Sequence, residues 1–101
     1  MLFRSRLPAV DRKQQLIDAA LPLAERYGFD SVSRTMVAAA ARVSESLLSR
    51  YWTAPDFQAA LLEAAIQREN LTVLAQGLAA RHPVAQAAPL ELRQAAAASL
   101  I

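Results

Sequence analysis

The sequence has no cysteine, one histidine and only two glycines among its 101 residues. Without cysteine the chain can form neither a disulfide nor a thiolate zinc site, and it has no Cys nucleophile. A single imidazole, that of His82, excludes a multi-histidine metal site. There is also no Gly-rich phosphate loop, no nucleophile–histidine pair within a motif and no carboxylate cluster. An enzyme is therefore the least favoured class of function, and we expect no metal and no cofactor.

Residues that favour β-sheets are scarce too, with 12 Val, Ile and Thr against 23 Ala. Because alanine has the highest helix propensity, this balance predicts an all-α protein, and the length suits a single domain. The longest stretch without a charged residue has 11 residues, from Asn70 to Ala80. A membrane span needs roughly 18 or more apolar residues, and the first residues hold no apolar segment of signal-peptide length. We therefore expect a soluble, cytoplasmic protein.

The positive charge is unevenly distributed along the chain. Residues 1–52 contain eight Lys and Arg against five Asp and Glu, a net charge of +3, whereas residues 53–101 contain three against four, a net charge of −1. The first half is therefore the candidate anion-binding half. A basic helix face that is merely solvated is the plainer alternative.

Capping residues and apolar spacing predict a first helix from about residue 11 to Gly28. Its apolar residues recur at steps of four, three and four: Leu16, Ala20, Leu23 and Tyr27. Pro22 lies inside this helix, and because its ring crowds the preceding turn we expect a kink or a break there.

Two short helices follow, at about residues 34–41 and 45–52. Ser33 and Ser44 have the chemistry of N-caps, and a three-residue turn that begins at Arg42 joins the two helices. Leu48 and Trp52 are four residues apart and are expected to point into the core. This spacing is that of a helix-turn-helix.

The rest of the chain is expected to form two more helices. Thr53 and Asp56 make a capping box for a helix that runs to about Ala80, with Arg68 as the one polar interruption of its apolar face. About 26 residues span about 39 Å, more than three short helices can cover, so the far end is expected to pack on a second subunit. His82 is expected to be a solvated helix-end residue, residues 83–89 a linker, and residues 90–101 a last helix that offers Leu92 and Leu100 to a partner.

A helix-turn-helix places one helix in the major groove of double-stranded DNA, where each base pair has its own pattern of donors and acceptors. The predicted DNA-facing residues of the helix at residues 45–52 are Ser46, Leu47, Ser49, Arg50 and Tyr51. The serines, Leu47 and Arg50 can contact base edges, and Arg50 or Tyr51 can contact a phosphate. Further predicted DNA contacts, to phosphates, come from the start of the preceding helix and from the turn: Ser33, Arg34, Thr35, Arg42 and Ser44. A basic N-terminal arm with Arg4 and Arg6 could reach the DNA backbone or the minor groove. In the plainer alternative Ser33 and Ser44 only cap helices, Tyr51 is a core aromatic residue, and the charged side chains of the arm have no binding role.

Three segments carry a resemblance to a known family: LIDAALPLAERYGFD at residues 16–30, VAAAARVS at residues 37–44, and Tyr51-Trp52. Over roughly residues 11–65 the chain resembles the N-terminal DNA-binding domain of the TetR family of transcriptional repressors. The resemblance implies a three-helix domain in which Ser33, Arg34 and Thr35 contact phosphates and the second short helix reads bases. More loosely, the chain is similar to short plasmid-encoded repressors of the KorC type, which implies a regulator of plasmid or phage genes.

The chain also departs from the family pattern. Arg42 stands where the family usually has Gly, Ser49 replaces a frequent Tyr, and residues 53–56 lack the usual Lys. Fewer than 40 residues follow the match, which leaves no room for the family's ligand-binding domain, so no small-molecule ligand is expected.

Together these observations favour a homodimeric, sequence-specific repressor that acts on a palindromic operator at the nucleoid. Its predicted parts are an arm at residues 1–10, a DNA-binding domain at residues 11–53 and dimerisation helices at residues 54–101. The alternative is a small helical adaptor or antirepressor that binds another regulator, because a fold does not guarantee a function.

Overall fold

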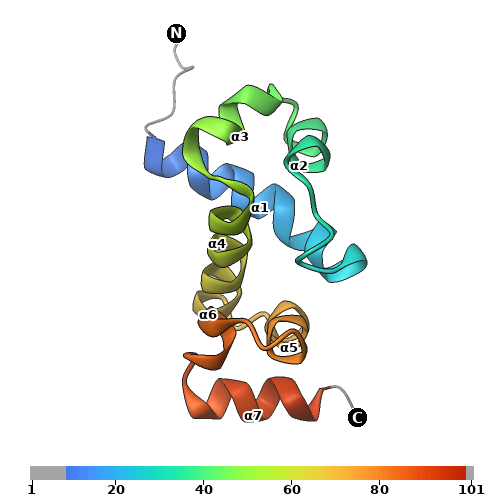
Figure 1. Cartoon of the computed structure of the whole chain (residues 1–101), viewed down its shortest axis with the longest axis vertical. Coiled ribbons are helices and arrows are strands. Elements are labelled where there is room, and N and C mark those ends of the chain that lie inside the picture. Colours follow the sequence, from blue (N-terminus) through green and yellow to red (C-terminus); the bar gives the residue numbers. More distant parts are fainter. Residues whose placement is uncertain (1–8, 100–101) are drawn as a thin grey trace, which may run out of the picture.

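The computed structural model describes residues 9–99, and every regular element in that range is a helix (Figure 1). The helices are α1 (Ala9–Tyr27), α2 (Arg34–Ala41), α3 (Glu45–Tyr51), α4 (Ala54–Gln67), α5 (Leu71–Ala79), α6 (Pro83–Gln86) and α7 (Leu90–Ala98). The predicted all-α class is confirmed. Arg4, Arg6 and Leu100, which the sequence assigned to DNA or to a partner, lie outside the described residues.

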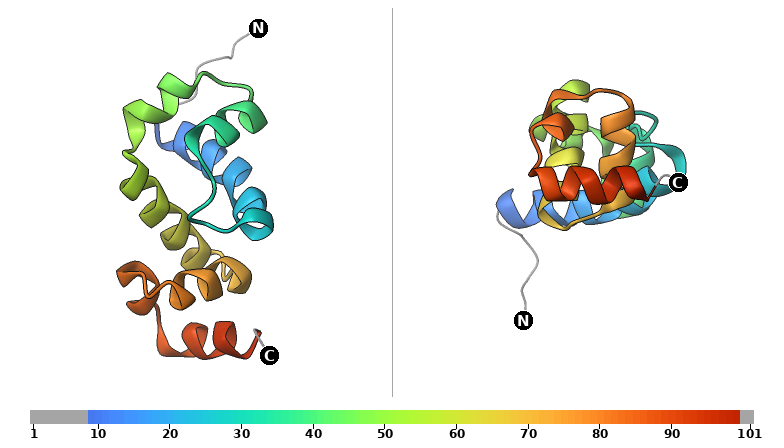
Figure 2. Two further views of the ribbon diagram at one scale, coloured as in Figure 1. Left: turned by 45° about the vertical axis from the view of Figure 1, so that its right-hand side comes forward. Right: turned by 90° about the horizontal axis from the view of Figure 1, so that it is seen from below.

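The molecule is elongated, with extents of 48 × 24 × 20 Å. Helices α2 and α3 lie at one end, α4 runs along the length, and α5, α6 and α7 form the other end (Figures 1 and 2). The long dimension therefore runs from α3 to α7 (Figure 1). Any DNA contact through α3 is remote from α7.

Helix α1 is continuous through Pro22, so the expected break is absent. Proline removes the hydrogen bond to the carbonyl of Asp18, but both residues are exposed and water can replace the lost donor. Leu21 and Ala24 on the opposite face are buried in the core. Their burial holds the helix together across the proline.

The prediction of one helix from residue 54 to residue 80 is wrong. Helix α4 ends at Gln67, Glu69 adopts a left-handed φ of 55°, and the Asn70 side chain caps α5 by accepting a hydrogen bond from the Val73 N–H at 3.1 Å. The Arg68 guanidinium forms an ion pair with Asp18 on α1. Helix α5 therefore folds back within the chain, and neither α4 nor α5 is long enough to require a second subunit for its far end.

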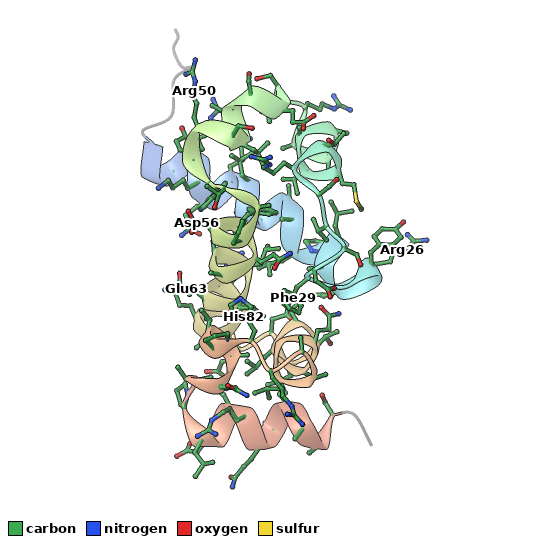
Figure 3. The ribbon with its side chains drawn as sticks, in the orientation of Figure 1. Arg26, Phe29, Arg50, Asp56, Glu63 and His82 are labelled. Carbon is green, nitrogen blue, oxygen red and sulfur yellow. The ribbon has the colours of Figure 1, made fainter. Side chains whose placement is uncertain are left out.

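Residues 83–89 are not a simple linker, because α6 lies within them. His82 Nδ1 accepts a hydrogen bond from the Val84 N–H at 3.1 Å and so caps this short helix. The half-buried His82 ring also packs edge-on against Phe29, with 5.9 Å between the ring centres (Figure 3). His82 is therefore a packed capping residue and not a solvated helix end.

Candidate nucleic-acid interface

The turn between α2 and α3 closes with a Schellman motif. The Arg42 N–H donates to the Ala39 carbonyl at 3.3 Å, and the Val43 N–H donates to the Ala38 carbonyl at 3.0 Å. Arg42 has a φ of 60° and a ψ of 46°, the left-handed conformation that usually favours glycine. Val43 packs against the core beside buried Ala38, which fixes the direction in which the chain enters α3.

Helix α3 has one buried and one exposed face. Leu48 is fully buried and Trp52 is 9% exposed, as predicted. The Trp52 ring packs against Phe57, with 5.2 Å between the ring centres. The opposite side exposes a set of mainly polar residues: Glu45, Ser46, Ser49 and Arg50. Arg50 extends away from the helices at the α3 end of the molecule (Figure 3).

The two predicted serine caps have different outcomes. Ser33 Oγ accepts a hydrogen bond from the Met36 N–H at 3.1 Å, which confirms the cap on α2. Ser44 occupies the N-cap position of α3 but makes no capping hydrogen bond with its side chain. Its hydroxyl instead lies 3.1 Å from the Ser46 hydroxyl, which competes with the backbone for it. The predicted capping bond of Ser44 is therefore wrong.

The Arg34 side chain is engaged within the domain. Its Nη1 donates to Ser49 Oγ at 3.2 Å and to the Trp52 carbonyl at 3.3 Å. Arg34 thus joins the first turn of α2 to the last turn of α3. Its neighbour Thr35 is exposed on the same turn of α2.

Lys13 is a residue at this surface that the sequence did not single out. Its Nζ lies 5.5 Å from the centre of the Tyr51 ring, and the Tyr51 side chain is half-buried. Tyr51 also packs against Trp52, with 5.7 Å between the ring centres. Tyr51 therefore lies between the buried Trp52 and the exposed face of α3. The proximity of Lys13 depends on how α1 crosses α3, which local sequence patterns do not report.

The structure thus brings the predicted site residues between Ser33 and Tyr51 to one end of the molecule, on three consecutive segments (Figures 1 and 2). The first turn of α2 carries Ser33, Arg34 and Thr35, and the turn carries Arg42 and Ser44. Helix α3 carries Ser46, Leu47, Ser49, Arg50 and Tyr51. The Leu47 side chain is half-buried, whereas the Arg42 side chain is exposed.

Residues 16–54, from α1 to the start of α4, match the family model described as bacterial regulatory proteins, tetR family. This segment is a TetR-family N-terminal helix-turn-helix domain. This match supports a DNA-binding transcription regulator and points to a non-enzymatic role. No curated protein and no solved structure matches the chain.

Two kinds of feature are absent from the described part of the chain. Within residues 9–99 no three His, Asp or Glu side chains are grouped so that they could hold a metal ion. None of the helices there combines the length and the apolar character that crossing a membrane requires.

Proposed function

We propose that this TetR-family chain is a homodimeric transcriptional repressor that binds a palindromic operator at the nucleoid and responds to no small-molecule inducer. Residues 11–53 bind DNA in this proposal, and residues 54–101 pair two chains. The observation that carries it is the two-faced α3, which is anchored by Leu48 and Trp52 while its polar side is exposed. Such a helix can enter a major groove without losing its place in the core.

Base reading is assigned to the exposed face of α3. Arg50 can donate two hydrogen bonds to guanine or contact a phosphate, Leu47 can contact a thymine methyl group, and Ser46 and Ser49 can pair with several base edges. Arg50 is exposed on the last turn of α3, where nothing in the helix blocks its approach to DNA. These side chains give the chain a means to distinguish sequences.

Phosphate contacts are assigned to the residues around α3. The free N–H groups at the start of α2, next to Ser33 and Thr35, attract an anion, and Arg42 adds positive charge in the turn. Tyr51 and nearby Lys13 can contact the backbone on the other side of α3. Affinity that depends on such contacts falls steeply as salt is raised.

Pairing of two chains must leave both α3 helices facing the same duplex. Because α3 and α7 lie at opposite ends of the 48 Å molecule, an end-to-end dimer through α7 would place the two α3 helices at opposite ends of the particle (Figure 1). We infer that the chains instead pair side by side through the flanks of residues 54–101, with the twofold axis along the long dimension. The recognition helices would then lie about 34 Å apart, or a multiple of it.

Selection of bound sequences from random duplex DNA tests this proposal, together with the mass of the free protein in solution. We expect a dimer and an inverted repeat whose half-site spacing is about one helical turn or a multiple. A monomer, or equal binding to every duplex, would contradict the repressor and leave the adaptor or antirepressor as the better description.

A pair of arginine variants locates the reading surface. Arg50→Ala should cost about 1–3 kcal/mol on the selected site and much less on unrelated DNA. Arg26→Ala removes the same charge from the exposed C-terminal end of α1, away from α3 (Figure 3). Its binding should equal that of the wild type, and equal losses for both variants would mean that overall charge and not α3 controls binding.

A further inference from the structure

We propose that Arg34 acts on DNA recognition through Ser49: it fixes the Ser49 hydroxyl as a hydrogen-bond donor toward the base that Ser49 faces. This inference rests on the proposed reading of DNA by α3. It assigns Arg34 the role of a positioning residue, in place of the phosphate contact that the family resemblance implies.

The position of Arg34 is unfavourable for its own helix. Arg34 is the first residue of α2, where the positive end of the helix dipole repels a cation, and no acidic residue lies in that first turn. Its guanidinium instead reaches the carbonyl of Trp52, the C-cap of α3, at 3.3 Å. There the negative end of the α3 dipole attracts it, so the electrostatic gain lies between the two helices and holds α3 against α2.

The same Nη1 atom lies 3.2 Å from Ser49 Oγ. A guanidinium can only donate, so the serine oxygen must be the acceptor in this contact. The hydroxyl hydrogen is then left for another partner, and among residues 9–99 it has only the Glu45 carbonyl at 3.4 Å, a long contact. A better-placed acceptor on DNA would take over this hydrogen.

The cation also makes the serine oxygen a poor acceptor for a second donor. It polarises the O–H bond and repels the partially positive amino group of a base. In the major groove guanine, adenine and thymine each offer an acceptor, whereas the polar group of cytosine is an amino donor. Ser49 is exposed on the outer side of α3, and we therefore expect it to disfavour cytosine at the base that it faces.

Selection from random duplex DNA with the full-length chain tests this inference through four proteins: wild type, Arg34→Ala, Ser49→Ala and the double variant. Discrimination against cytosine should fall by roughly fivefold to tenfold at one position of the half-site, and at the same position in all three variants. The double variant should lose no more than Ser49→Ala, because both changes remove the same interaction.

The salt dependence separates positioning from a phosphate contact. Loss of one phosphate contact lowers the slope of log K against log salt by about 0.9, uniformly across sequences. We expect the salt slope of Arg34→Ala to equal that of the wild type. The control Arg42→Ala removes the same charge from the exposed turn, and it should lower the salt slope but leave the base preference unchanged. Arg34→Lys keeps the charge but not the planar fork, and it should not restore the base preference.

Two results would overturn the inference. One is a lowered salt slope for Arg34→Ala with its base preference intact, and the other is an unchanged preference at every position for Ser49→Ala. Because Ser49 is exposed, the second result can be obtained even if circular dichroism shows Arg34→Ala to be unfolded. A wild-type chain that selects no sequence would instead contradict the proposed function itself.

Discussion

The two ends of the molecule are packed by different kinds of side chain. Among the buried apolar residues described, the 11 from Leu16 to Trp52 include three alanines, whereas the six from Val73 to Ala96, beyond α4, include four. From Ala75 onward all the buried apolar residues are alanines: Ala75, Ala85, Ala88 and Ala96. The end formed by α1, α2 and α3, which is the DNA-binding end in our proposal, is therefore filled by large side chains, whereas the α5–α7 end depends on close approach of helices. The stability of the DNA-binding end should therefore be sensitive to cavities, and the stability of the α5–α7 end should be sensitive to added atoms.

The largest expected effect is a cavity at the DNA-binding end. Leu48→Ala removes a fully buried side chain that anchors α3, and it should lower the free energy of unfolding by about 2–5 kcal/mol. Urea unfolding followed by circular dichroism measures the loss. The matched control is Leu90→Ala on α7, where the side chain is 56% exposed and the change should stay within about 0.5 kcal/mol. Similar losses for both variants would show that burial does not distinguish the two leucines.

The opposite change tests the α5–α7 end. A Cβ added at Gly77 would lie 2.6 Å from Leu62 Cδ2 and 2.8 Å from Ala85 Cβ. Although Gly→Ala inside a helix ordinarily stabilises a protein by about 0.5–1 kcal/mol, Gly77→Ala should destabilise this one by about 1–3 kcal/mol. Thermal unfolding gives the sign directly. A variant as stable as the wild type would mean that α4 and α6 can move apart from α5.

The Gln76 side chain on α5 connects the two ends by two hydrogen bonds. Its Nε2 donates to the Ala24 carbonyl at 3.0 Å, and its Oε1 accepts from the Phe29 N–H at 2.9 Å. Gln76→Leu keeps the size but leaves these groups without that partner, so we expect a loss of about 1–3 kcal/mol in urea unfolding. Gln94→Leu on exposed α7 is the control and should change stability by less than about 0.5 kcal/mol. No difference between the variants would mean that water replaces Gln76 without cost.

The sequence predicted the DNA-binding end better than the α5–α7 end for a physical reason. At the first end Ser33 is a local capping signal, and Leu48 and Trp52 keep a helical period with no competing signal, so local patterns decide the structure. At residues 68–70 two signals conflict: Leu71 and Leu74 continue the apolar period of α4, while Asn70 caps a new helix. The apolar period favours one continuous helix over residues 54–80, which is longer than either helix in the structure.

Side-chain contacts across the candidate site could not be predicted from local patterns. Arg34 meets Ser49 and Trp52 across separations of 15 and 18 residues, and Lys13 meets Tyr51 only because α1 passes beside the end of α3. Such contacts depend on the angles between helices and on the choice of rotamer. The sequence identified the surface, but it did not distinguish a side chain free to bind DNA from one already engaged.

The smallest expected effect compares one strained turn at each end. Arg42 and Arg81 adopt φ values of 60° and 57°, and glycine takes this conformation without the steric cost of a Cβ. Each Arg→Gly variant should therefore gain about 0.5–1 kcal/mol over the Arg→Ala variant at the same position, measured by thermal unfolding. Only the Arg42 variants should bind the selected operator more weakly, because Arg81 lies between α5 and α6 at the far end of the molecule (Figure 1). If Arg81→Gly weakened operator binding as much as Arg42→Gly does, binding would follow total charge. If the Gly and Ala variants were equally stable, neither turn would be strained.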